Sequence, residues 1–283
     1  MIGKSRQSPS SGRIKRIFDT GLEKTRGVLR WPPSAGQFKH VRRYPPRDLA
    51  PWIDSYWMVN WDLPQPYLQE TLPHPNFHFV FEKGKCVIFG TSTTKFSRVL
   101  QGKDGVFGVK FRPGGFRPYI KGPIAEWLNR VAPARRVFGE ETAVLQDKLA
   151  SLSWKTDKMI EASNAFFRAR LPEPDPRIDL ANKIVRLIVE QREIKTVADL
   201  EARTGIGIRK LQRLFSEYVG VSPKWVIRRN RLHELVEILN SGSEPDWAQV
   251  AVELGYFDQA HLINEFKAIV GSPPAEYQKN GDG

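Results

Sequence analysis

One sequence pattern occurs twice in the last third of this chain, and it restricts the fold more strongly than any other feature. The first copy is RTGIGIRKLQRLFSEYVGVSP at 203–223, and the second is VELGYFDQAHLINEFKAIVGSPP at 252–274. When the two copies are aligned with a one-residue gap in the turn, five positions hold identical residues: Gly205 and Gly255, Leu211 and Leu262, Phe215 and Phe266, Gly220 and Gly271, and Pro223 and Pro274. The shared residues are apolar or turn-forming, whereas the polar residues between them differ. The chain therefore carries two similar structural units with different surfaces.

The positions of helix breakers predict that each unit is a pair of short helices. In the first unit Thr196 can N-cap a helix that ends near Gly205, and an amphipathic helix follows at 208–218. In the second unit Gly255 separates two further helical segments. Two short helices joined by a glycine-containing turn form a helix-turn-helix, whose second helix enters the major groove of DNA.

A long helix is predicted between the two units. Ser222 and Pro223 supply an N-cap and a first-turn proline for it. A helix over 223–240 would be about 27 Å long at 1.5 Å per residue, which is comparable with the ~34 Å between successive major-groove segments. One monomer could therefore place two recognition helices in an asymmetric DNA site.

A set of residues in 177–283 stands where a known family pattern has them: Leu211, Gln212, Arg213, Phe215, Gly220-x-Ser222-Pro223, Arg231-Leu232, Gly255-Tyr256, Phe266-Lys267, Gly271 and Pro274-x-x-Tyr277. On these residues the region resembles the DNA-binding domain of AraC/XylS-type bacterial transcriptional regulators. The segments GVLRWPP, RRYPPRDLAPWIDSYWMVNWDL and GVKFRPGG also resemble the N-terminal half of a subgroup of these regulators. The resemblance implies a sequence-specific transcriptional regulator that is not an enzyme.

Two positions depart from that family pattern. Gly207 stands where the family usually has a Ser that caps the first recognition helix, and Gly costs only a few tenths of a kcal/mol there. Glu201 stands where a small Ala normally packs between the helices, and a buried carboxylate is costly unless it is paired. We therefore expect Glu201 to tilt outwards or to meet a base such as Arg203 or Arg209.

The predicted DNA contacts lie on the outward faces of the two recognition helices. The alternative is that these basic residues only face solvent, as they do on many amphipathic helices. The residues expected to contact bases are Arg209, Gln212, Arg213, Gln259, His261 and Asn264. The residues expected to contact phosphates are Lys210, Lys224, Arg228, Arg229 and Lys267. Arg231 resembles a family position that often makes structural salt bridges, so a structural role is expected for it.

The positive charge of the chain is unevenly distributed. The formal net charge is +13, and residues 1–47 hold twelve Lys or Arg against two acids. The half that carries the repeat, 177–283, is neutral, with fifteen bases and fifteen acids. Within that half, 203–231 carries +7 and 232–283 carries −7. Because phosphate attraction follows local positive charge, the first unit is expected to supply most of the affinity.

The rest of the chain predicts an α+β domain before the helical one. Residues 1–36 are basic and rich in Ser, Gly and Pro, which favours a mobile tail. Residues 37–170 combine a β-rich, cupin-like half barrel, including a hairpin in NFHFVFEKGKCVIFG, with helices nearer their end. LPEPDP at 171–176 cannot continue a helix and is interpreted as a linker. The predicted fold is this domain followed by an all-α double helix-turn-helix domain at 177–283.

The sequence is also compatible with two alternatives for the N-terminal half. A cupin-like metalloenzyme would use His74, His78 and Glu82, but His78 and Glu82 are about 13 Å apart along one strand. A protein-interaction domain without a small-molecule ligand is the other alternative. Cys86 has no identifiable catalytic partner, so a nucleophilic role is not expected for it. Arg112 and the following Pro-Gly-Gly could form an anion-binding nest, but the end of a strand followed by a tight turn explains them better.

The composition favours a cytoplasmic bacterial protein. The sequence contains no run of about 18 apolar residues, so no membrane span is predicted. The N-terminus also lacks the apolar segment of a signal peptide. The single cysteine, Cys86, excludes an internal disulfide framework and fits a reducing compartment. The expected partners are double-stranded DNA, RNA polymerase and a small-molecule effector, with no metal, no cofactor and no membrane.

Overall fold

The computed structural model describes residues 27–29, 37–241 and 245–279. The tail predicted at 1–36 lies outside the described residues except for a short piece. In that piece Val28 forms a β-bridge with Thr71, and Leu29 is fully buried.

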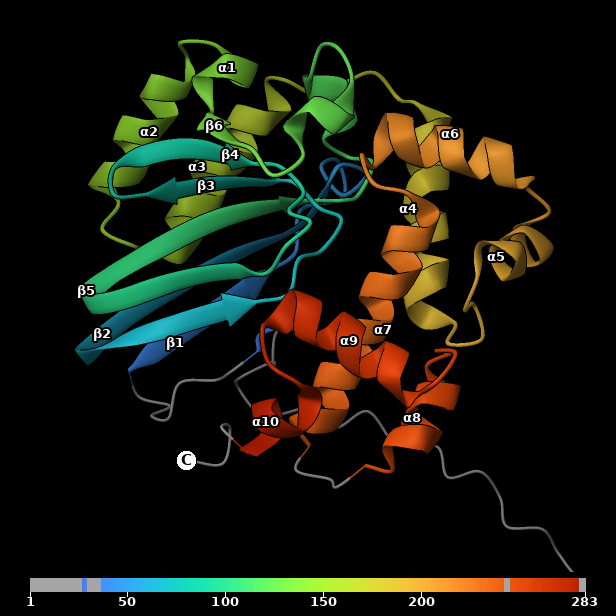
Figure 1. Ribbon diagram of the computed structural model, residues 1–283. Helices are drawn as coiled ribbons and strands as arrows, with labels where there is room; N and C mark the ends of the chain where they lie inside the picture. The colour runs from blue at the N-terminus through green and yellow to red at the C-terminus, as the bar shows by residue number, and fades with distance from the viewer. Residues whose placement is uncertain (1–26, 30–36, 242–244, 280–283) are drawn as a thin grey trace, which may run out of the picture.

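The N-terminal region folds around one antiparallel sheet of six strands in the order β1-β2-β5-β3-β4-β6 (Figure 1). The strands are β1 (Phe38–Arg43), β2 (Ile53–Thr71), β3 (His78–Glu82), β4 (Lys85–Phe89), β5 (Phe96–Phe111) and β6 (Val131–Pro133). The predicted hairpin is confirmed, because β3 and β4 pair from His78 with Phe89 to Glu82 with Lys85. Lys83 and Gly84 form its turn with positive φ angles of 47° and 68°.

Short helices precede and follow β6 in the chain. They are the 3₁₀ helices η1 (Arg117–Tyr119) and η2 (Ile124–Trp127), and the α-helices α1 (Arg135–Phe138), α2 (Thr142–Ser151) and α3 (Thr156–Arg168). The helices α1, α2 and α3 cover one face of the sheet (Figure 1). Aromatic rings fill the core between the sheet and α3. Phe167 meets Phe79 and Phe111 in edge-on contacts, with ring centroids 5.8 Å and 5.5 Å apart.

The remainder of the described chain is entirely helical and begins after the proline-rich segment. Its helices are α4 (Pro176–Glu190), α5 (Val197–Thr204), α6 (Ile208–Tyr218), α7 (Pro223–Leu239), α8 (Trp247–Glu253), α9 (Gln259–Val270) and α10 (Pro274–Lys279). Asp175 N-caps α4 by accepting a hydrogen bond from the Arg177 amide. A β-rich region followed by a helical one is therefore confirmed. None of the described helices is long and apolar enough to span a membrane.

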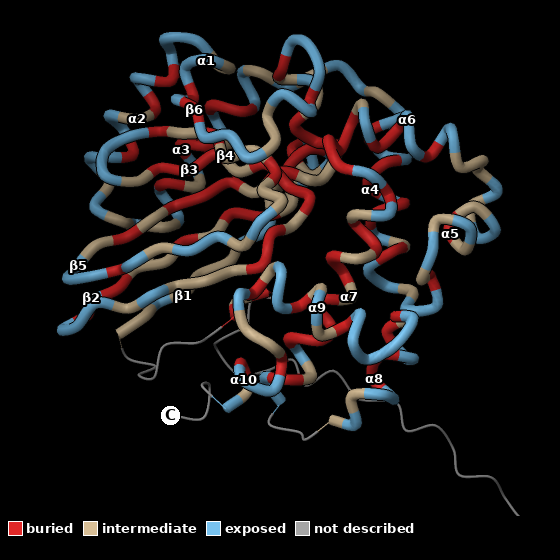
Figure 2. The backbone as a smooth tube through the Cα atoms, in the orientation of Figure 1, coloured by how far each residue is buried: buried red, intermediate tan, exposed pale blue. Residues whose placement is uncertain are grey.

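The helical region shares its hydrophobic cores with the N-terminal region. Trp52 joins the core of α4, α5 and α6, and Leu128 packs against the same core. Leu29 and Leu72 join the core of α7, α8 and α9. Figure 2 shows buried stretches in the sheet and again in α4 and α7. Both helix-turn-helix units are thus completed by residues from outside 177–283.

Candidate nucleic-acid interface

The first unit consists of α5, a glycine turn and α6. Thr196 caps α5 by accepting from the Asp199 amide at 3.0 Å, and the Asp199 carboxylate accepts in return from the Thr196 amide at 2.7 Å. Gly205 ends α5 in the left-handed conformation, with φ of 68°, where a side chain would be strained. These local signals set the angle at which α6 leaves the turn.

α6 separates an apolar face from a polar one. Leu211, Leu214 and Phe215 are buried in the core. The predicted contacts on the opposite face are all exposed: Arg209, Lys210, Gln212 and Arg213. Lys224, in the first turn of α7, is exposed as well. Every predicted DNA contact of the first recognition helix therefore has its side chain available to solvent.

The two departures from the family pattern compensate for each other. Gly207 is the N-cap of α6 and has no side chain with which to cap it. Glu201 of α5 instead accepts a hydrogen bond from the Ile208 amide at 3.1 Å, through its Oε1 atom. The expectation that Glu201 would turn outwards or meet an arginine was therefore wrong. The orphan amide at the start of a helix is a better partner, because it also places the carboxylate at the positive end of the helix dipole.

Replacing Glu201 by Ala is expected to destabilise the protein by about 1 kcal/mol, the usual value of a lost N-terminal cap. In the Gly207→Ser background the same replacement should cost much less, because the serine hydroxyl can take over as the cap. A double-mutant cycle measured by urea denaturation tests this coupling. Equal losses in both backgrounds would show that the two positions act independently.

The second unit consists of α8, a longer turn and α9. Asp258 caps α9 by accepting from the His261 amide at 2.7 Å. The predicted contacts on α9 are all exposed: Gln259, His261, Asn264 and Lys267. The His261 ring stands edge-on to Tyr256, and its Nε2 atom lies 3.8 Å from the Glu265 carboxylate.

Two arginines expected to contact phosphates are bound to other groups of the protein, and one of them is buried. Arg228 binds Glu265 of α9 in a bidentate ion pair with nitrogen–oxygen distances of 2.7–3.0 Å. Arg229 is only 5% exposed and donates to the Thr93 carbonyl at 2.9 Å. Burial lowers the pKa of Arg229 to about 10. The expected phosphate contact from Arg229 is therefore not met in this conformation, because α7 turns this side chain towards the N-terminal region.

Arg231 has the structural role expected of it, although its partners are carbonyl groups and not carboxylates. Its guanidinium donates to the Gly255 carbonyl, in the turn of the second unit, at 3.2 Å. The same group donates to the Lys195 carbonyl, just before α5. Arg231 thus joins the two helix-turn-helix units to each other through α7.

α6 lies beside the start of α7, and α9 packs across α7, where Glu265 pairs with Arg228. Figure 1 shows α6 and α9 crossing the view in the same direction, so their N-terminal ends lie on the same side. The N-terminal region contacts the other ends: Ile124 and Leu128 surround Gly220 after α6, and Lys95 donates to the Val270 carbonyl of α9 at 2.6 Å. The ends that meet bases in a helix-turn-helix are therefore left uncovered.

Comparison with known families assigns both parts of the chain. Residues 200–280 match the helix-turn-helix domain family. The C-terminal domain is an AraC-type helix-turn-helix domain. The protein is accordingly a DNA-binding transcriptional regulator. Residues 41–133 match a domain of unknown function, DUF6597. No curated protein matches the chain significantly.

Several solved structures are similar to this regulator. A probable AraC family transcriptional regulator from Rhodopseudomonas palustris is 26% identical, and the match covers 35% of this chain and 97% of that one, with a TM-score of 0.30. ToxT from Vibrio cholerae is 13% identical over 87% of this chain and all of its own, with a TM-score of 0.38. ToxT bound to an unsaturated fatty acid is 15% identical over 86% and 93%, with a TM-score of 0.36.

The alternative metal site of the N-terminal region is not favoured by the partners of its residues. His78 accepts a hydrogen bond from the Trp57 indole at 3.1 Å, and burial lowers the pKa of His78 to about 3. Glu82 pairs with Arg98 in β5, and His74 stacks on His233 of α7 with ring centroids 4.3 Å apart. Among the residues that the structure describes, no three His, Cys, Asp or Glu side chains form a metal-binding group.

Two further candidates have structural explanations. Burial raises the pKa of the Cys86 thiol to about 12, so the sulfur is not a thiolate at neutral pH. The Pro-Gly-Gly turn is a domain contact, because the Gly114 amide donates to Asn182 of α4 at 3.0 Å. Arg112 donates to the Ala50 carbonyl at 2.6 Å. The anion-binding interpretation of this turn is therefore not supported.

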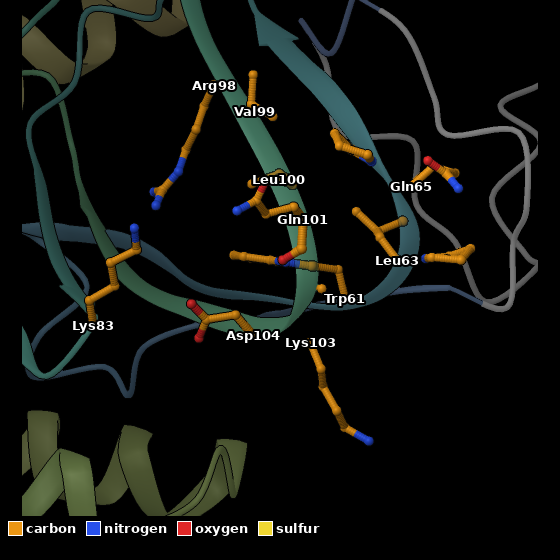
Figure 3. Close-up of a pocket in the computed structure, with 13 residues that line it drawn as sticks. Trp61, Leu63, Gln65, Lys83, Arg98, Val99, Leu100, Gln101, Lys103 and Asp104 are labelled. Atoms are coloured by element: carbon orange, nitrogen blue, oxygen red, sulfur yellow. The ribbon is translucent and has the colours of Figure 1, made fainter.

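A cavity of about 730 Å³ lies against the middle of the paired strands β2 and β5, around the point where Leu63 pairs with Gly102 (Figure 3). Trp61, Leu63 and Leu100 form its apolar part and belong to one small cluster. Figure 3 shows Arg98 and Lys83 extending towards each other across it. Glu82 already neutralises Arg98, so Lys83 is the cation of this pair that remains available to a ligand.

Proposed function

We propose that this regulator binds double-stranded DNA by placing α6 and α9 in two successive segments of the major groove. The observation that carries the proposal is the common direction of these two helices, with polar faces exposed on both. α7 separates the helices and has 17 residues, which corresponds to about 26 Å at 1.5 Å per residue. That length suits segments one helical turn apart.

The chemistry of α6 supports it as the main reader of bases. Arg209 and Arg213 have guanidinium groups suited to the two acceptors of guanine, and the Gln212 amide suits adenine. Lys210 and Lys224 lie beside them as phosphate contacts that position the helix. None of these side chains takes part in an ion pair among the described residues.

α9 is proposed to adjust specificity, with less contribution to affinity. Its base contacts are Gln259, His261 and Asn264, and its phosphate contact is Lys267. The net charge of −7 over 232–283 opposes a strong electrostatic contribution from this unit. Glu265 is held away from DNA by its ion pair with Arg228, which limits the repulsion between this carboxylate and phosphate.

Selection from random duplex oligonucleotides by the full-length chain tests the proposed function. The expected result is one preferred site with two sequence elements centred about one helical turn, 10–10.5 base pairs, apart. Changing Arg209, Gln212 and Arg213 together to Ala should erase the preference in one element and leave the other. Recovery of no preferred sequence by the wild-type chain would contradict the proposal.

The proposed role of residues 37–170 is that of a cytoplasmic sensor domain without catalytic activity, whose partners are a small-molecule effector and RNA polymerase. The cavity beside Trp61 has the volume of small-molecule sites, which span about 300–1,000 Å³. Its apolar part and Lys83 suit a small apolar ligand with an anionic group. Such a ligand should raise the melting temperature of the wild-type protein, and less so after Lys83→Ala.

A further inference from the structure

Phe257 is the most exposed large hydrophobic side chain of the described residues, at 91%. It belongs to the turn between α8 and α9. This turn is one residue longer than the first, since six positions separate Gly205 from Leu211 and seven separate Gly255 from Leu262. Phe257 is the additional residue.

The fold does not account for Phe257. In the first turn Ile206 packs against the neighbouring core, and in the second turn Tyr256 occupies the equivalent place and is buried. Phe257 precedes the N-cap of α9, a position from which an apolar side chain often packs against the fourth helical residue. That residue, Leu262, is already fully buried without it. Among the residues that the structure describes, none therefore packs against this ring in a way that explains its position.

The position of Phe257 is at the start of the second recognition helix. It directly precedes Asp258, the N-cap of α9, and the next three residues are exposed. The N-terminal residues of a recognition helix are those that contact base edges. The apolar feature that the major groove offers there is the C5 methyl group of thymine, for which Phe is a suitable partner.

We propose that Phe257 contacts the methyl group of a thymine in the DNA segment read by the second unit. This inference rests on the proposed function and adds a specificity determinant to it. An apolar contact suits a unit of negative net charge, because it requires no attraction to phosphate. The ring supplies a discrimination that Gln259, His261 and Asn264 lack, since their hydrogen-bonding groups do not recognise a methyl group.

The test combines Phe257→Ala with replacement of single thymines by deoxyuridine, which removes only the methyl group. Full-length wild-type protein should lose about fourfold in affinity at one thymine of the selected site, the size expected for one buried methyl group. Phe257→Ala should bind the unmodified site about threefold to tenfold more weakly. At that thymine the variant should be insensitive to the replacement.

The matched control is Val252→Ala, which removes a 65% exposed apolar side chain from α8. It should leave both affinity and the deoxyuridine response unchanged. Melting temperatures of both variants should equal that of the wild type, because neither side chain is buried.

Three results would overturn the inference. If Phe257→Ala keeps the wild-type response at every thymine, the ring does not read a methyl group. If the variant binds DNA normally but no longer supports transcription, Phe257 contacts a protein such as RNA polymerase. If the wild-type chain selects no sequence at all, the proposed function fails and this inference fails with it, an outcome distinct from the first two.

Discussion

Replacing Arg213 or Arg209 by Ala is expected to weaken binding to the selected site by roughly tenfold or more, because a lost bidentate base contact costs about 1–3 kcal/mol. Asn264→Ala on α9 should change the affinity by less than about threefold. The two arginines are exposed and belong to a segment of +7, whereas Asn264 belongs to one of −7. The larger contribution of α6 to DNA affinity is thus expected from the net charge of the surrounding segment as well as from the side chains of the helix.

Binding curves for these variants on one selected site, at one salt concentration, measure the difference. Lys224→Ala provides the control: it should weaken binding to all sequences alike and reduce the salt slope by about one. A larger loss from Asn264→Ala than from both arginine variants would show that the acidic unit is the principal reader.

Arg231→Ala is expected to lower the free energy of unfolding by about 2–4 kcal/mol. The guanidinium donates to the carbonyls of the half-buried residues Gly255 and Lys195. A hydrogen bond from a charged group contributes about 1.5–3 kcal/mol, and less where water can replace it. Arg231→Lys should recover only part of the loss, because a lysine cannot present the planar fork that reaches both carbonyls.

Urea denaturation monitored by helical circular dichroism tests this prediction. Arg213→Ala, which removes an exposed arginine, should change the free energy of unfolding by less than about 0.5 kcal/mol. A similar result for Arg231→Ala would mean that water replaces the guanidinium at both carbonyls.

The double helix-turn-helix could be predicted because its signals are local. Caps at Thr196 and Ser222 and the left-handed Gly205 act within a few residues of their own positions. The apolar period of α6 correctly placed Leu211 in the core and Arg213 in solvent for the same reason. The exposed face of each recognition helix was therefore predictable from the sequence.

The partners of individual charged residues were less predictable. Glu201 caps α6 across the turn, and Arg228 pairs with Glu265, 37 positions away. Arg229 donates to a carbonyl 136 positions away, at Thr93. Whether an arginine faces DNA or another part of the chain depends on which backbone groups the fold brings close to it. The spacing of residues in the sequence does not predict these contacts.

The two helix-turn-helix units, their exposed faces and the hairpin of β3 and β4 follow from short-range periodicity and turn chemistry, so they could be predicted from the amino-acid sequence. No local pattern predicts that the two units share hydrophobic cores with the N-terminal region, through Trp52 in the first core and Leu72 in the second. Burial of an apolar side chain lowers the free energy equally well against any apolar surface. The choice of surface therefore depends on the shape of the whole chain, which no local pattern specifies.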